Sequence, residues 1–453
     1  MTEDAIGRYR RLVQQAQADE RVPALSVALH RGDRPLWTCQ VGGEPGRLFR
    51  LGSVTKTFTA VLVMQCRDDG LLDLDDPVGR HLGVSRFGEV TVRRLLSHTG
   101  GVQREPYGDI WDTLRIPDRE RLLAELAHAG QVLPPGRRYH YSNLGFALLG
   151  HLVGQVRGGT WAEVLAQRVL APLGLGSVTP EPGERATTGY LVDAYSDHAR
   201  PEPAIDLAGL APAAQLWGTA ADLARWAAFL ADPAAVDPGG AVLAPASLDE
   251  MRWPLTTTDE ALWAVAFGLG LILVPSENET RVIHVGHDGA MPGFLAGVYG
   301  RRGEAAPPAC GVAVLGSSGT AGKILDLPHT LLRAAAEHDP AEIAAWLPGE
   351  PAPPDLRPVL GRWWGEGFEF VFFWRDGALH ARGAEDPAGR PPAVFEPVDG
   401  EPDVLRTVSG REVGELLRLT RDPASRAVVR MHWATYRFTR DQQTFDSLPA
   451  RGD

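Results

Sequence analysis

The chain has 453 residues, which is too long for one ordinary hydrophobic core and indicates two or three domains. A hydrophobic content of 44% and a charged content of 23% are typical of soluble globular proteins. The net charge of −12 argues against nucleic acid or an anionic membrane as a partner, so we expect a small-molecule substrate.

The N-terminal segment predicts an amphipathic helix and no targeting signal. Apolar side chains form a helical stripe among charged residues at Ile6, Tyr9, Leu12 and Val13. The segment has no apolar core followed by a small-residue cleavage site, and no later apolar run approaches the length of a membrane span. We therefore expect a cytoplasmic protein without a membrane partner.

Two strands and a helix are expected next. Residues 24–42 have the pattern of two strands around a turn at Arg31–Asp33, and residues 53–69 have that of a helix which Gly70 ends. We expect one face of this helix to be buried, namely Phe58, Val61, Leu62, Gln65 and Cys66. Residues 71–235 alternate helical patterns with turn clusters, which predicts a mostly helical insert.

Strand patterns return at residues 267–274, 281–286, 293–300 and 310–317, and a helix is expected over 321–337. Strands at both ends of this region predict an α+β domain over residues 1–338. Its antiparallel sheet would be flanked by helices, with the helical insert at about 71–235. The cysteines, Cys39, Cys66 and Cys310, are too few for a disulfide framework, so we expect buried, unpaired thiols.

The C-terminal part differs from the preceding residues in composition and in its predicted elements. Residues 339–358 are rich in proline and acidic groups and indicate a linker, and residues 359–445 carry short strand patterns typical of a small all-β barrel or sandwich. Alternate residues of one strand are expected in its core: Phe368, Phe370, Phe372 and Trp374. Arg437 and Arg440 are either surface residues or partners of a substrate carboxylate. Residues 446–453 are expected to be a tail.

The segment Gly52–Lys56 is a candidate nucleophile site. Residues i and i+3 share one face of a helix, so Ser53 and Lys56 would be neighbours at a helix N-terminus with free backbone N–H donors. An activated hydroxyl, a base and an oxyanion donor are the parts of a covalent serine mechanism. Arginine does not deprotonate in proteins, and the chain has only two lysines among its 45 basic side chains. An ordinary helix start remains the alternative.

Two further segments offer polar groups. Tyr141 and Asn143 follow a Pro-Gly loop and precede an apolar helix; beside Lys56, the tyrosine would have a lowered phenol pKa and carry protons, while Asn143 would bind a substrate amide. A helix cap with a packed tyrosine is the alternative. His287, Asp288 and Gly289 follow a strand, where glycine permits close backbone approach. A strand-end turn, or a metal site with His284, are the alternatives there.

Taken together, these segments resemble the penicillin-recognising serine enzymes: the class C β-lactamases, D-alanyl-D-alanine carboxypeptidases, D-aminopeptidases and β-lactamase-like esterases. FRLGSVTKTFTAVLVMQ resembles their first motif, YSNLGFALLG their Tyr-x-Asn motif, and GHDGAMPGF their Lys/His-x-Gly motif. The resemblance covers residues 20–335 and implies a β-lactamase/transpeptidase-like fold. The C-terminal region resembles the lipocalin-like barrels appended to some members, including cyclases that release nonribosomal peptides.

The resemblance implies a role for each site residue. Ser53 is acylated, Lys56 and Tyr141 handle its proton in an order left open, and Tyr141 also serves the leaving group and the deacylating water. Asn143, Gly289 and Ala290 bind the substrate. The N–H groups of Ser53 and Ala290 form the oxyanion hole, and His287 supports the hydrogen-bond network. No cofactor and no metal is expected.

Two departures from the family pattern bear on the substrate. His287 replaces the lysine of true β-lactamases and is only partly charged near neutral pH, so a β-lactam carboxylate would bind weakly. The segment PAAQL, before WGTAADL, stands where relatives often have paired glycines.

We therefore expect a hydrolase of esters or peptide-like amides. The alternatives are an acyltransferase that cyclises or releases a peptide, and a non-catalytic binding or sensor protein. The absence of a G-x-S-x-G segment disfavours an α/β-hydrolase. The oligomeric state and the barrel's role are left open.

Overall fold

The computed structural model describes residues 3–258, 262–276, 282–303, 310–338, 349–365, 367–387 and 390–442. The chain divides into two compact units, Met1–Glu342 and Ile343–Asp453. The expected linker lies partly, and the expected tail wholly, outside the described residues.

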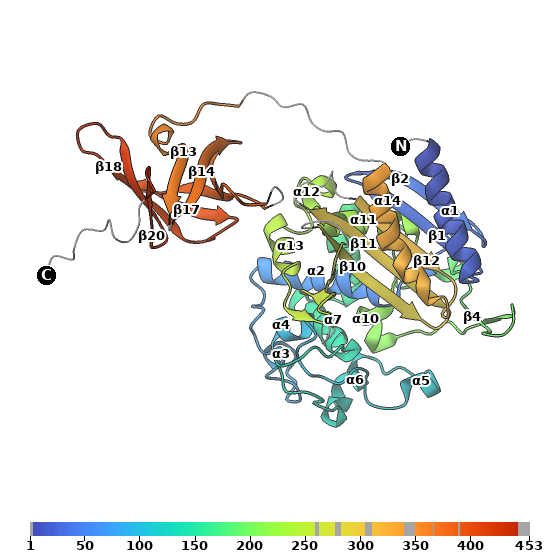
Figure 1. The fold of residues 1–453 in the computed structure, drawn as a ribbon. Helices are drawn as coiled ribbons and strands as arrows, with labels where there is room; N and C mark the ends of the chain where they lie inside the picture. Colours follow the sequence, from blue (N-terminus) through green and yellow to red (C-terminus); the bar gives the residue numbers. More distant parts are fainter. Residues whose placement is uncertain are drawn as a thin grey trace. The chain divides into compact units, whose positions relative to one another are not determined.

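The first unit is built on one antiparallel sheet of eight strands (Figure 1). In the order in which they pair, the strands are β2 (Arg34–Val41), β1 (Leu25–Arg31), β12 (Cys310–Gly316), β11 (Phe294–Gly303), β10 (Val282–Met291), β9 (Ile272–Pro275), β8 (Ala266–Phe267) and β7 (Thr256–Thr257). The N-terminal strand β1 pairs with the late strand β12, as a sheet made from both ends of the region requires. The predicted α+β architecture is confirmed.

Two of the expected strands differ in extent. The pattern at residues 267–274 is not one strand, because a turn at Gly268–Gly270, with Gly270 at φ +74°, separates β8 from β9. In contrast, β10 does not end at Gly286 but continues through His287, Asp288 and Gly289 to Met291. The pairing of these residues with β11 carries the strand through a sequence with little strand preference.

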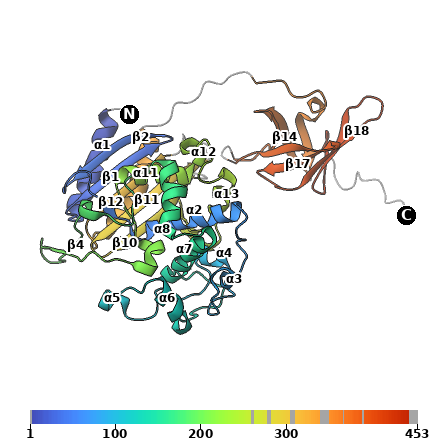
Figure 2. The ribbon, with the colours of Figure 1, turned by 180° about the vertical axis from the view of Figure 1, so that it is seen from behind.

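Helices cover both faces of the sheet. α1 (Glu3–Asp19) and α14 (Leu327–His338) pack against each other and lie in front of the strands in Figure 1. α11 (Ala220–Ala231) packs on β1, β11 and β12 from the other side, which Figure 2 shows from behind. A Cβ added at Gly300 or Gly311 would come within 2.1 Å of a carbonyl oxygen of α11, so these glycines permit the close contact.

Helices are also the main regular structure between β2 and β7, but most are short. Besides α11, they are α2 (Thr55–Asp68), α3 (Val78–Leu82), α4 (Val92–Leu96), α5 (Ile110–Thr113), α6 (Arg119–Glu125), α7 (Asn143–Arg157), α8 (Trp161–Leu165), α9 (Ala171–Leu173), α10 (Ala211–Ala214), α12 (Pro233–Val236) and α13 (Pro245–Met251). Two small strand pairs that were not expected are β3 (Phe49–Arg50) with β6 (Trp217–Gly218), and β4 (Tyr190–Val192) with β5 (Ala199–Pro201). No helix in the described ranges is long and apolar enough to cross a membrane.

Helix α2 runs through the interior of the first unit. The five residues expected to be buried are buried, but burial is not limited to one face, because every residue from Thr55 to Cys66 is buried. The helix contacts β10 on one side and α7 and α10 on the other, because the helical insert closes over it. Its threonines find partners inside: Thr57 accepts a hydrogen bond from Trp226, and Thr59 donates one to the Pro212 carbonyl.

The second unit holds a closed antiparallel barrel whose eight strands pair in chain order. They are β13 (Gly361–Gly365), β14 (Phe368–Arg375), β15 (Ala378–Gly383), β16 (Ala393–Val398), β17 (Glu401–Ser409), β18 (Leu416–Arg421), β19 (Val428–Trp433) and β20 (Tyr436–Thr439). Its interior is filled by large buried side chains such as Trp363, Phe372, Phe395 and Met431. The expected small all-β barrel is confirmed.

Arg440 of the barrel is occupied within its own unit. Its guanidinium lies 3.9 Å from the centre of the Trp363 ring and donates to the carbonyls of Arg362 and Leu360 at 2.9 and 3.1 Å. These contacts favour a structural role for Arg440 over contact with a substrate carboxylate.

Candidate active site

Ser53 lies where a short 3₁₀ turn, η1 (Gly52–Val54), leads into α2. Gly52 has φ +51°, a backbone conformation that favours glycine. The turn packs against β10: a Cβ added at Gly289 would lie 1.9 Å from the Leu51 carbonyl oxygen and 3.3 Å from the Ser53 nitrogen. Ser53 is half-buried and Ala290 is exposed, so solvent reaches the place where the two backbones meet.

Lys56 lies directly beside the Ser53 hydroxyl. Its Nζ atom is 2.9 Å from Ser53 Oγ, as the spacing of three residues predicts. The lysine side chain has no solvent exposure. Burial is the largest cause that holds the pKa of Lys56 well below its usual value; nearby Glu105 raises this pKa and Arg104 lowers it.

The contacts of Lys56 fit a neutral amine. Nζ also lies 2.7 Å from Asn143 Oδ1 and 2.9 Å from the Ala213 carbonyl oxygen, and both of these atoms only accept hydrogen bonds. A neutral amine has two N–H groups, which these two acceptors use. Its lone pair can then accept the Ser53 proton, whereas Lys56 Nζ in the ammonium form donates to Ser53 Oγ. Ala213 belongs to the segment PAAQL, which departs from the pattern of the resembled family. This segment therefore supplies one hydrogen-bond acceptor for Lys56.

Asn143 is the first residue of α7, and Ser142 caps that helix by accepting from the Gly145 N–H at 2.9 Å. The Asn143 Nδ2 group donates to Glu105 Oε1 at 2.6 Å, which leaves Oδ1 for Lys56. Both ends of the amide are therefore engaged within the protein, whereas the sequence pattern favoured contact with a substrate.

Tyr141 forms a hydrogen bond with Ser53, and Lys56 Nζ lies 4.8 Å from the centre of its ring. Burial raises the pKa of the Tyr141 phenol well above its usual value, and the hydrogen bond with Ser53 opposes this only in part. The expected lowered pKa was wrong, because burial of the phenol outweighs the neighbouring groups that lower its pKa. The phenol is a proton donor at neutral pH.

His287 faces the site from β10, with its ring 6.1 Å from that of Tyr141. It is buried, and Nδ1 donates to the Asp288 carbonyl oxygen, so Nε2 carries a lone pair. Burial, with Lys56 as the second cause, lowers the pKa of His287 to about 3. The expected partial charge near neutral pH was wrong: the imidazole is neutral.

The metal alternative fails on the geometry of β10. Side chains alternate along a strand, so His284 and Asp288 point to one face of the sheet and His287 to the other. His284 Nδ1 instead lies 2.8 Å from His329 Nδ1 on α14. In the part of the chain that the structure describes, no three His, Cys, Asp or Glu side chains are grouped to hold a metal ion.

Two residues of the site were not singled out from the sequence. Glu105 fixes Asn143, and His98 stacks on the Tyr141 ring at 4.3 Å between centroids. His98 is buried and its Nδ1 accepts from the Ser142 N–H at 3.1 Å. Burial and then Lys56 lower the pKa of His98 well below its usual value, so this histidine is neutral too. In the sequence, His98 stands in the segment TVRRLLSHTGGV.

Comparison with known proteins agrees with this geometry. Residues 9–335 match the model of a family described as Beta-lactamase, and residues 352–440 match a domain of unknown function, DUF7586. Penicillin-binding protein 4 of Amycolatopsis lactamdurans is 33% identical over 361 residues, which are 76% of this chain and 89% of that protein.

Solved structures share the fold at low sequence identity. The D-amino acid amidase from Ochrobactrum anthropi SV3, complexed with L-phenylalanine amide, superposes with a TM-score of 0.61 at 22% identity over 74% of this chain and 99% of the amidase. The octameric penicillin-binding protein homologue from Pyrococcus abyssi gives a TM-score of 0.60 at 22% identity over 96% of this chain and 99% of the homologue.

Proposed function

The chain belongs to the beta-lactamase family, and we propose that it is a serine hydrolase which forms an acyl-enzyme at Ser53 and cleaves an ester or a peptide-like amide. The observation that carries this proposal is the 2.9 Å contact between the accessible Ser53 hydroxyl and the buried amine of Lys56, whose pKa is lowered. A hydroxyl becomes a useful nucleophile only beside a group that can take its proton.

In the acylation step, Ser53 Oγ attacks the substrate carbonyl carbon while its proton moves to Lys56 Nζ. The carbonyl π electrons move to the oxygen, which the N–H groups of Ser53 and Ala290 would stabilise. The proximity of the η1 backbone to β10 supports this pair of donors. When the carbon–leaving-group bond breaks, Tyr141 donates a proton to the leaving group, and Lys56 returns a proton to the phenolate. Water then attacks the acyl-enzyme with the same groups acting in reverse order.

The environment of His287 supports esters and amides over β-lactams as substrates. A neutral imidazole with its lone pair on Nε2 offers no positive charge to a substrate carboxylate. The D-amino acid amidase shares the fold of this chain at 22% identity, and this fold is compatible with an amide as substrate.

Mass spectrometry after incubation with p-nitrophenyl acetate tests the proposal. We expect one acetyl group on the peptide that contains Ser53, and no label on that peptide in a Ser53→Ala variant. Ser196→Ala, a change of an exposed serine, is the control and should label normally. If Ser53→Ala keeps turnover within about tenfold of the unmodified protein, Ser53 is not the nucleophile. Addition of a primary amine distinguishes the acyltransferase alternative, in which the amide would replace the free acid as product.

A further inference from the structure

The barrel of the second unit has a cavity at one end. Eight antiparallel strands in chain order place the β13–β14, β15–β16, β17–β18 and β19–β20 connections at the same mouth of the barrel. The residues that line a cavity of about 440 Å³ come from these four connections and from the strand ends beside them. A barrel of eight strands is wide enough either to fill with side chains or to hold one small ligand. In this barrel, side chains fill the rest of the interior, and the cavity is open at this mouth.

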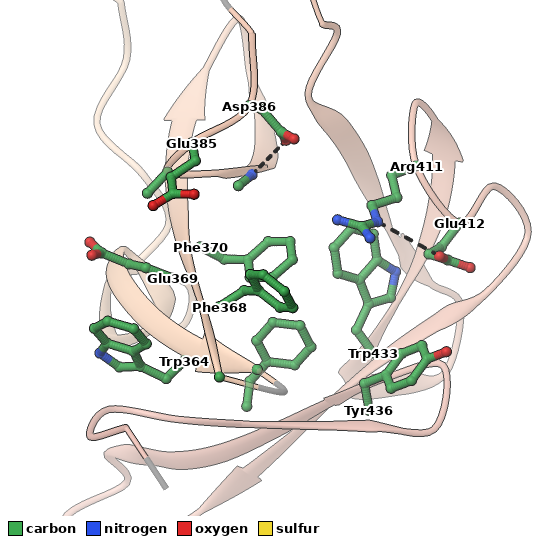
Figure 3. A pocket seen from close by; sticks show the side chains of 15 residues that line it. Trp364, Phe368, Glu369, Phe370, Glu385, Asp386, Arg411, Glu412, Trp433 and Tyr436 are labelled. Atoms are coloured by element: carbon green, nitrogen blue, oxygen red, sulfur yellow. Dashed lines mark hydrogen bonds and ion pairs between the residues drawn. The ribbon is translucent and has the colours of Figure 1, made fainter. Parts of the chain in front are cut away.

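Aromatic rings form the wall of the cavity. Phe368 continues the inward-facing row of Phe370 and Phe372, but it is 67% exposed because it lies at the open mouth. Tyr436 is 43% exposed on the other side. Figure 3 shows the rings of Phe368, Phe370, Trp433 and Tyr436 around the same space. Exposed rings that converge in a concave site are the usual lining of a ligand pocket.

The charge at the mouth is negative. Four carboxylates line the cavity, those of Glu369, Glu385, Asp386 and Glu412, against one guanidinium, that of Arg411. Glu369 and Asp386 are paired with Arg362 and Arg390, which are not among the lining residues. Glu385 is exposed and makes no ion pair with any described residue. It is the carboxylate that remains available to a ligand.

Arg411 shows how a cation is held at this place. Its guanidinium lies 5.4 Å from the centre of the Phe370 ring and 3.8 Å from Glu412. The face of the Phe370 ring and the Glu412 carboxylate therefore already bind one cation, the guanidinium of Arg411. An anionic ligand would find one arginine that is already paired with Glu412, and the unpaired carboxylate of Glu385 would repel it.

We propose that the mouth of the barrel binds a small organic cation with an apolar body, such as an arylalkylamine. The apolar body lies against Phe368 and Tyr436, and the ammonium group meets the ring faces and Glu385. This binding site shares no residue with the proposed acyl-enzyme chemistry, so an experiment can refute either proposal without affecting the other.

Saturation-transfer NMR titrations of the full chain test the proposal with three probes of similar shape: phenethylamine, 2-phenylethanol and 3-phenylpropionate. We expect phenethylamine to bind about tenfold more tightly than 3-phenylpropionate. Phe368→Ser and Glu385→Gln should each weaken phenethylamine about three- to tenfold, since a cation–ring contact or a carboxylate is lost. Ester hydrolysis should not change in either variant.

The controls change one exposed apolar residue, Val429→Ser, and one exposed carboxylate, Glu396→Gln, on the barrel away from the cavity. Tyr436→Ser replaces Phe368→Ser if that variant does not fold. The proposal is overturned if phenethylamine does not bind saturably, if 3-phenylpropionate binds as tightly, or if the control variants weaken binding as much as the cavity variants.

Discussion

Replacement of Lys56 by arginine separates the positive charge of this residue from its capacity to act as a base. The guanidinium keeps donors for Asn143 Oδ1 and the Ala213 carbonyl oxygen, but it cannot take the proton of Ser53. Lys56→Met removes both the charge and the base. If Lys56 acts as the base, both variants should lose acylation to a similar extent.

The expected size of the loss follows from the role. A positioned general base contributes roughly 10²–10⁴-fold to a rate, and about 10³-fold corresponds to about 4 kcal/mol in the activation free energy. Lys56 has no solvent exposure, so the larger arginine also has to be accommodated in a packed site, at about 1–3 kcal/mol of folding free energy. Lys56→Arg should therefore lower both the rate and the melting temperature.

The assay is the burst of p-nitrophenol from p-nitrophenyl acetate, together with the acyl-enzyme mass. The chain provides a matched control in its other lysine: Lys323 is 85% exposed and lies 3.9 Å from Glu20, so Lys323→Arg should leave the rate unchanged. A Lys56→Arg protein that is folded and acylates within about tenfold of the unmodified rate would show that Lys56 supplies a charge and not a base.

Three further outcomes are expected. The kcat/KM for p-nitrophenyl acetate should exceed that for a chromogenic cephalosporin, because neutral His287 cannot anchor a carboxylate; efficient cephalosporin hydrolysis without esterase activity would contradict this. Burial raises the pKa of Asp288 to about 7, so its stabilising effect is complete below the unfolded value of about 4 and is lost as the pH rises through 7. Asp288→Asn should therefore raise the melting temperature relative to the unmodified protein by a few degrees more at pH 8 than at pH 5; an equal effect at both would refute it. A chain that ends after Glu342 should still be acylated at Ser53, because all proposed chemical groups precede that residue; a truncated protein that is folded by circular dichroism yet not acylated would show that the barrel contributes.

The contact between Ser53 and Lys56, the proposed nucleophile and base, was predictable because the relation between the two residues is local. A spacing of three residues at a helix start brings Ser53 and Lys56 together whatever the rest of the chain does, and a lysine in an arginine-rich chain marks the position. Glu105 and His98 were not predictable in this way. Their partners Asn143 and Ser142 lie 38 and 44 residues away, and only the packing of the helical insert brings them into contact.

The errors about protonation have one physical cause. The sequence shows which charges are near one another, but not how much water is removed around them. For Tyr141 and His287, burial outweighs every neighbouring charge and shifts each pKa toward the neutral form. The extent of β10 was underestimated for a related reason, since β11 provides the pairing that the sequence GHDGAM does not favour by itself.

In the proposed acylation, these pKa shifts leave one proton to transfer among the groups around Ser53. Tyr141 holds its proton because its pKa is raised, His98 and His287 are neutral because theirs are lowered, and burial favours the neutral form of Lys56. In the proposed acylation step, transfer of the Ser53 proton would therefore create a single new cation, on Lys56. Glu105, which raises the pKa of Lys56, stabilises that cation, while burial prevents it from forming before the substrate arrives. Burial lowers the pKa of Lys56 and Glu105 raises it, so the two influences on the proposed base act in opposite directions.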